Sequence, residues 1–183
     1  MLATFQARAE AVSAEVHRCA GNREALEFVL SLLAREGVAD RPGAGAVWAE
    51  VERLPGADPA ALARRVPGLS FEVTRERAAE ARVGITGAAY AVAATGTLAL
   101  VSDRVEVRLA STLPEIHVTL VDSGRILPDL AALLGRLGPA QTRYLALVTG
   151  PSRTADIERV LTIGAHGPRR LVVVLVDGLE GGS

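Results

Sequence analysis

The chain has a single cysteine and no lysine, because all 20 basic residues among its 183 are arginines. One thiol, Cys19, cannot form an internal disulfide. It also cannot supply the several thiolates that an iron–sulfur cluster or a structural zinc site requires. We therefore expect no cofactor and no metal site in this chain. Without lysine, a Schiff base and a P-loop are excluded, and an anion must be bound by guanidinium, hydroxyl or backbone N–H groups.

Excess charge, aromatic residues and long apolar runs are also lacking. The net charge is −1, which predicts no attraction to nucleic acid or to an anionic membrane. Hydrophobic residues make up 49% of the chain but aromatics only 3%, so the core must consist of Ala, Val and Leu. The amino-terminal stretch lacks the uninterrupted apolar run typical of a signal peptide, and the longest apolar run is too short to span a bilayer. We expect a cytoplasmic protein.

The pattern of apolar residues predicts one α/β domain over 1–183, with a central, mostly parallel sheet flanked by helices. Helices are expected over residues 2–12, 23–36, 59–66 and 129–137. Asn22 is expected to cap the second of these helices and Asp58 the third. Strands are expected over residues 69–73, 97–101, 101–111, 116–121, 144–150 and 171–177, with an inserted β-hairpin around 101–111. Residues 13–22 fit either a continued helix or a short strand, and residues 46–51 fit a strand or one helical turn. The chain to residue 40 is mainly helical, and 178–183 has the composition of a disordered tail.

The segment TGPSRTADIERVLTIGAHGP, residues 149–168, is rich in polar groups between two predicted strands. We expect a helix to begin near Thr154, so that its N-terminus faces the carboxyl end of a parallel strand, where ligands bind. Gly150 would let a ligand approach the backbone, and the hydroxyls of Ser152 and Thr154 would donate hydrogen bonds to it. Arg153 would form two parallel hydrogen bonds to a small carboxylate or phosphate.

The alternative interpretation is purely structural. Ser152 or Thr154 would cap the expected helix, and Asp156 and Glu158 would interact favourably with its dipole. Those two acids would also repel an anion. The sequence leaves both interpretations open.

The histidines give little evidence of catalysis. His166 is the one weak candidate, as a general base for Ser152, but the second glycine of G-x-S-x-G is missing and no acid is placed to orient the ring. A structural role for His166 in its loop is the alternative. His117 fits a core or edge histidine, His17 fits the surface, and their spacing does not predict a metal site.

A second candidate segment is the turn before the strand at 97–101. Thr95, Gly96 and Thr97 either form a tight turn or place hydroxyls and backbone N–H groups beside a ligand.

Taken together, VGITGAAYAVAATGTLAL, LPEIH, GPSRTADIE and GAHGP resemble the lactate-utilisation protein C family, whose members contain a LUD domain. The matching motifs follow one another closely over residues 83–177 and are fewer before residue 83. It implies a fold like that of the NagB/RpiA/CoA transferase group and favours a strand near residue 17. It also implies a role in oxidising L-lactate to pyruvate beside iron–sulfur partner proteins that would carry the clusters. Members of the family usually have acids where this chain has Ala89 and Ala94, and alanine cannot act as a base.

These observations lead to two hypotheses. The first is an accessory subunit of a lactate-oxidising system, not catalytic on its own, that docks on iron–sulfur partners or binds a small anion. The alternative is a stand-alone isomerase or acyl-transferase that acts on a phosphate- or carboxylate-bearing metabolite.

Overall fold

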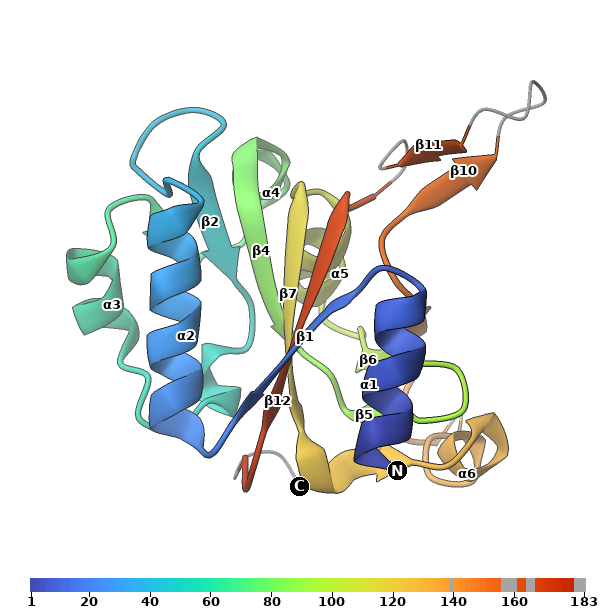
Figure 1. The fold of residues 1–183 in the computed structure, drawn as a ribbon. Coiled ribbons are helices and arrows are strands. Elements are labelled where there is room, and N and C mark those ends of the chain that lie inside the picture. The colour runs from blue at the N-terminus through green and yellow to red at the C-terminus, as the bar shows by residue number, and fades with distance from the viewer. Residues whose placement is uncertain (139, 156–160, 164–166, 180–183) are drawn as a thin grey trace.

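The protein is built around a six-stranded parallel sheet (Figure 1). The computed structural model describes residues 1–138, 140–155, 161–163 and 167–179. The strand order is β1-β12-β7-β4-β2-β3. These strands are β1 (Glu15–Cys19), β2 (Gly45–Trp48), β3 (Leu69–Ser70), β4 (Ala81–Gly87), β7 (Ile116–Asp122) and β12 (Arg170–Val176). The predicted α/β class and parallel sheet are therefore confirmed.

Helices cover both faces of this sheet (Figure 1). One face packs against α2 (Asn22–Arg35) and α3 (Pro59–Arg65). The opposite face packs against α1 (Leu2–Ala11), α4 (Arg75–Glu80) and α5 (Val105–Thr112). The central strand β12 contributes to both cores, and residues 171–176 are at most 1% exposed. Its continuous apolar run is what a parallel strand covered on two faces requires.

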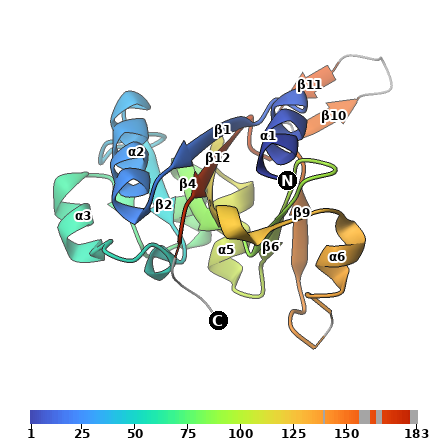
Figure 2. The same cartoon turned by 60° about the horizontal axis from the view of Figure 1, so that its bottom comes forward.

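A second, four-stranded sheet has the order β8-β5-β6-β9. Its strands are β5 (Tyr90–Val92), β6 (Thr97–Val101), β8 (Ile126–Leu127) and β9 (Leu145–Val148). Strands β5 and β6 form an antiparallel hairpin inserted after β4, and β9 pairs antiparallel with the other edge of β6. The short helix α6 (Leu130–Leu134) packs beside this sheet, as Figure 2, a view rotated by 60°, also shows.

The inserted hairpin lies earlier than the sequence predicts. Residues 101–111 were expected as its strand because Val105, Val107 and Leu109 alternate with polar residues, yet most of this segment is helix α5. Its buried positions are Val107, Ala110 and Ser111, which follow a helical spacing, whereas Val105 is exposed. Tertiary packing on β4 overrides the local strand pattern here.

The strand at 144–150 also differs from expectation. We predicted a strand of the parallel sheet, but β9 belongs to the second sheet and its Leu147 is exposed. Among the described residues around Thr154, no helix begins. Residues Arg153–Ala155 form β10 instead, which pairs antiparallel with β11 (Leu161–Ile163) in a ribbon that projects from the body (Figure 1). Asp156, Glu158 and His166 lie outside the described residues.

Other elements follow the sequence closely. The ambiguous segments become β1 and β2, and a 3-10 turn, η1 (Val51–Arg53), follows β2. Asp58 caps α3 by accepting a hydrogen bond from the N–H of Ala60 at 3.0 Å, as predicted. Helix α2 begins at Asn22 itself, with Gly21 as the cap. Helix α6 is shorter than expected and is capped by Asp129. Within the described part of the chain, no helix is long and apolar enough to cross a membrane.

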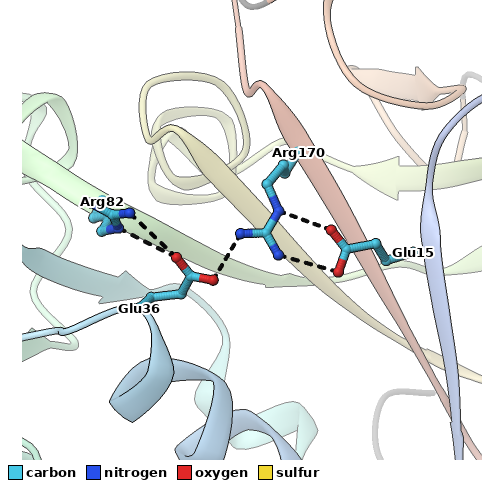
Figure 3. Close-up of polar contacts among 4 residues, drawn as sticks. All are labelled: Glu15, Glu36, Arg82 and Arg170. Atoms are coloured by element: carbon cyan, nitrogen blue, oxygen red, sulfur yellow. Dashed lines mark hydrogen bonds and ion pairs between the residues drawn. The ribbon is translucent and has the colours of Figure 1, made fainter.

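Four charged side chains join the amino edge of the parallel sheet (Figure 3). Arg170, the first residue of β12, contacts both carboxylate oxygens of Glu15 at 2.9 and 3.2 Å, and Glu36 at 2.8 Å. Arg82 of β4 reaches the other oxygen of Glu36 at 3.4 Å. Burial raises the pKa of Glu36, but the hydrogen bonds and charges of both arginines leave that pKa below its usual value. The network ties β1, β12, β4 and the end of α2 together.

Candidate functional site

A pocket of about 240 Å³ lies where the 149–152 segment meets the amino edge of the sheet. It is lined by Ser111, Thr112, His117, Leu147, Val148, Thr149, Gly150, Pro151, Ser152, Gly167, Pro168 and Leu171. Gly150 and Ser152, two of the predicted ligand-binding residues, line this pocket. The predicted ligand role itself remains a prediction.

The pocket lies at the opposite edge of the sheet from the one we predicted. The amide of Ser152 donates to the carbonyl of Pro168 at 2.9 Å, two residues before β12 begins. Strand β9 therefore brings the chain to the amino ends of the parallel strands, because β9 belongs to the other sheet. Strand β10 occupies Arg153–Ala155, where we expected the N-terminus of a helix that would bind an anion.

His117 forms part of the pocket wall and is also a core histidine, as predicted. Its side chain lies on the face of the sheet toward α5, and it is 1% exposed. Its Nε2 atom lies 2.8 Å from the Thr86 hydroxyl and 2.9 Å from the Thr119 hydroxyl. Burial lowers the pKa of His117 to about 3, so the imidazole is neutral near pH 7. It can exchange hydrogen bonds but offers no positive charge.

The predicted threonines are connected to the pocket by a chain of hydroxyls. Thr95 Oγ1 lies 2.7 Å from Thr97 Oγ1, which lies 2.8 Å from the Oγ1 of the pocket residue Thr149. Thr97 and Thr149 are separated by 52 residues in sequence and meet because β6 pairs with β9. The hydroxyl chain joins the two segments that the sequence analysis singled out separately.

The predicted glycines fit the packing of α1. Gly96 has φ +67°, and a Cβ there would lie 2.6 Å from the backbone carbon of Arg8. Gly150 has φ +77°, and a Cβ would lie 3.3 Å from Val12 Cβ and closer still to its carbonyl. Both positions require glycine for the chain to pass close to α1. This packing accounts for the glycines without a ligand.

Helix α5 forms a second wall of the pocket. Ser111 and Thr112 both donate their hydroxyls to the carbonyl of Arg108, at 3.1 and 2.6 Å. The helix sits directly on Gly84 of β4, where a Cβ would lie 2.9 Å from the carbonyl carbon of Ala110. Sequence reasoning did not identify α5 as part of a site, because its spacing suggested a strand.

No charged side chain lines the pocket among the described residues. Arg153 follows Ser152 directly, and the structure describes its backbone in β10 together with that of Thr154. Within the described part of the chain, no three His, Cys, Asp or Glu side chains gather as a metal site would require. Cys19 is buried in the core. The pocket thus offers hydroxyls, backbone groups and one neutral imidazole.

Comparison with known proteins gives a consistent result. A family model described as the LUD domain matches residues 2–176. Lactate utilization protein C of Halalkalibacterium halodurans is 32% identical over 108 residues, which are 56% of this chain and 47% of that protein. YkgG of Escherichia coli, an uncharacterized protein, is 32% identical over 107 residues, covering 55% and 46%. The chain spans about half the length of these relatives.

One further relative and one solved structure are also similar to this chain. Lactate utilization protein B of Bacillus subtilis is 33% identical over 113 residues, which are 57% of this chain but 22% of that protein. Among solved structures, a DUF162 family protein from Deinococcus radiodurans has a TM-score of 0.58 at 22% identity, with 96% of this chain and 95% of that one covered. The structural match supports the fold.

Proposed function

Since this chain belongs to the LUD domain family, we propose that it is an accessory subunit of a lactate-utilisation system that oxidises L-lactate to pyruvate. The observation that carries the proposal is the match of the family model to residues 2–176, together with relatives named lactate utilization protein B and C. Oxidising lactate removes two electrons. The single thiol of this chain, Cys19, is 2% exposed and cannot ligate a cluster, so the electrons would pass to iron–sulfur partner proteins.

The pocket beside Ser152 is the proposed place for a small carboxylate or phosphate. It supplies hydroxyls from Thr149 and Ser152, and the neutral imidazole of His117 can accept or donate one hydrogen bond. Arg153, next along the chain, would supply the charge that the described lining lacks. Among the described residues, the lining contains no carboxylate that could serve as a base, so a holding role is the one that we propose for the pocket.

The subunit role is tested by co-purification. We would co-express the tagged chain under anaerobic conditions with the iron–sulfur proteins encoded beside it, and expect both to be retained with it. The tag alone is the control. If the partners pass through with intact clusters while the chain is folded, the accessory role is wrong.

The ligand role is tested by thermal shift with L-lactate, pyruvate and inorganic phosphate as probes. Arg153→Ala should reduce the ligand-induced rise in Tm while leaving the melting of the free protein nearly unchanged. Arg169→Ala is the matched control, because Arg169 is exposed and lies just beyond the pocket residue Pro168. Equal stabilisation of all three proteins would refute the anion site at this pocket.

A further inference from the structure

The order of the strands places a topological switch point between β2 and β4. From β2 the chain moves outward to β3 through α3, which packs on the same face as α2. From β4 it moves the other way, to β7, through the inserted hairpin and α5 on the opposite face. Two neighbouring parallel strands whose connections diverge leave a crevice at their carboxyl ends, and ligands bind there in open α/β sheets.

Glu50 and Arg53 lie at this carboxyl edge, immediately after β2. The side chain of Glu50 is 13% exposed and that of Arg53 is 20% exposed. The distance from Arg53 Nη1 to Glu50 Oε1 is 3.7 Å, and Arg53 Nη2 lies 3.5 Å from the carbonyl of Ala88, which follows β4. Both contacts are long for a guanidinium so deeply buried. Arg53 therefore retains hydrogen-bonding capacity.

Glu50 has two features that its packing does not explain. Its backbone adopts φ 59°, a left-handed conformation that glutamate rarely takes. Its Oε2 atom is buried without a hydrogen-bond partner among the described residues, as is Nε1 of Trp48 at the end of β2. Buried acceptors are normally satisfied. The backbone N–H of Gly87 also acts on the Glu50 carboxyl and lowers its pKa, but no described donor lies within hydrogen-bond distance of Oε2.

Gly87 leaves the space that the side chain of Arg53 occupies beside Glu50. It is the last residue of β4, and a Cβ there would lie 2.6 Å from Arg53 Nε and 2.7 Å from Arg53 Cδ. The missing side chain is what allows the guanidinium to lie across the end of β4. A second cation stands nearby, but Arg104 is paired with Glu52 at 2.8 Å. Arg53 is the less firmly paired of the two.

We propose that Glu50 and Arg53 form a binding site for a small 2-hydroxycarboxylate at the switch point between β2 and β4. The guanidinium of Arg53 holds the carboxylate of the ligand, and Glu50 Oε2 accepts a hydrogen bond from the adjacent hydroxyl. The ligand carboxylate shares Arg53, the cation of the site, with Glu50, and Glu50 Oε2 receives a hydrogen-bond donor from the ligand. A dianionic phosphate is disfavoured because Glu50 would repel its two charges more strongly than the single charge of a carboxylate.

Burial raises the pKa of Glu50, against the lowering effect of Arg53 and Arg104, which agrees with a carboxyl group held away from solvent. The site is separate from the pocket beside Ser152, which lies at the other edge of the sheet, and the choice of a 2-hydroxycarboxylate as ligand rests on the proposed lactate role. Sequence reasoning missed both residues, because they fall in a segment interpreted only as a short strand or a helical turn.

Calorimetric titration of the whole chain tests the proposal, with L-lactate and glycolate as probes and propionate as the ligand without a hydroxyl. The wild type should bind both hydroxy acids more tightly than propionate. Arg53→Gln should weaken all binding by about tenfold or more, because it removes a charge-assisted hydrogen bond. Glu50→Ala should make hydroxy acids and propionate bind equally. The matched control is the neighbouring exposed pair, as Arg104→Gln and Glu52→Gln, which should change binding less than threefold, on the order expected of solvent-exposed charges.

Gly87→Ala keeps the test decisive if Arg53→Gln fails to fold. It leaves Arg53 in the chain but displaces the guanidinium from the end of β4, and binding should be lost to a similar extent. Ser152→Ala should leave this binding unchanged, which separates the site from the other pocket. The proposal is overturned if the wild type shows no saturable binding of either hydroxy acid, if Arg53→Gln or Gly87→Ala binds as the wild type does, or if Glu50→Ala retains the preference for the hydroxyl.

Discussion

Acidification should destabilise the protein through His117, and the size of the effect follows from its burial. Burial lowers the pKa of His117 from the ordinary value of 6.5 to about 3 in the folded chain. Below the unfolded pKa, the unfolded state binds a proton that the folded state does not, so the free energy of unfolding falls as the pH falls. The loss runs from about pH 6.5 down to about pH 3.

The magnitude can be worked from the same two pKa values. Each unit of difference corresponds to about 1.4 kcal/mol, so moving from about pH 7 to about pH 5 should cost about 2 kcal/mol from this residue. The contribution is large against a typical domain stability of about 5–15 kcal/mol. Other groups also titrate in acid. Glu50, whose pKa is raised by burial, acts with the opposite sign, because its folded form takes up a proton first.

The assay is urea denaturation across this pH range, for the wild type and for His117→Gln. Glutamine can place an amide group near the position of Nε2, between Thr86 and Thr119, but does not titrate. The difference between the two proteins cancels the other groups, and the wild type should lose about 2 kcal/mol more than the variant. His17→Gln is the control, since His17 packs partly buried against Phe28. Parallel pH profiles for the wild type and His117→Gln would refute the burial argument.

Two further predictions concern packing and charge. Gly96→Ala should cost about 2 kcal/mol more than Gly37→Ala, because both glycines have nearly equal positive φ (+67° and +68°) but only a Cβ at Gly96 would meet the backbone of α1; chemical denaturation measures this, and equal losses would contradict it. A double-mutant cycle on Glu36→Gln and Arg170→Gln should give a coupling of about 1 kcal/mol that shrinks in high salt, because Arg170 is about two-fifths exposed. A coupling near zero at low salt would show that the network in Figure 3 does not contribute to stability.

The parts of the fold that local pattern controls were predictable from the sequence. The apolar stripe of α2, the cap at Asp58 and the continuous apolar run of β12 each specify one element. The run LALV in β9 was ambiguous, since a short apolar segment fits a central parallel strand and a strand of a second sheet equally well. Helix α5 was missed because two valines and a leucine alternate, while its burial is decided by contact with Gly84.

The candidate site was predictable in composition but not in position. The segment 149–152 does reach a pocket, yet the edge of the sheet that it reaches depends on which sheet β9 joins. The hydroxyl link between Thr97 and Thr149 spans 52 residues and depends on strand pairing, which periodicity does not report. Glu50 and Arg53 carry no motif, and their interest comes from a positive φ, a partnerless oxygen and a neighbouring glycine, all of which are three-dimensional facts.

The contact between α5 and Gly84 has a consequence for selectivity. The helix rests on bare backbone, so the wall formed by Ser111 and Thr112 cannot move toward the sheet and has no flexible side chain beneath it to yield. The width of the 240 Å³ pocket is therefore set by the main-chain contact between Gly84 and α5. A single methyl group added at position 84 would displace the helix and thereby widen the pocket, although Gly84 does not line it.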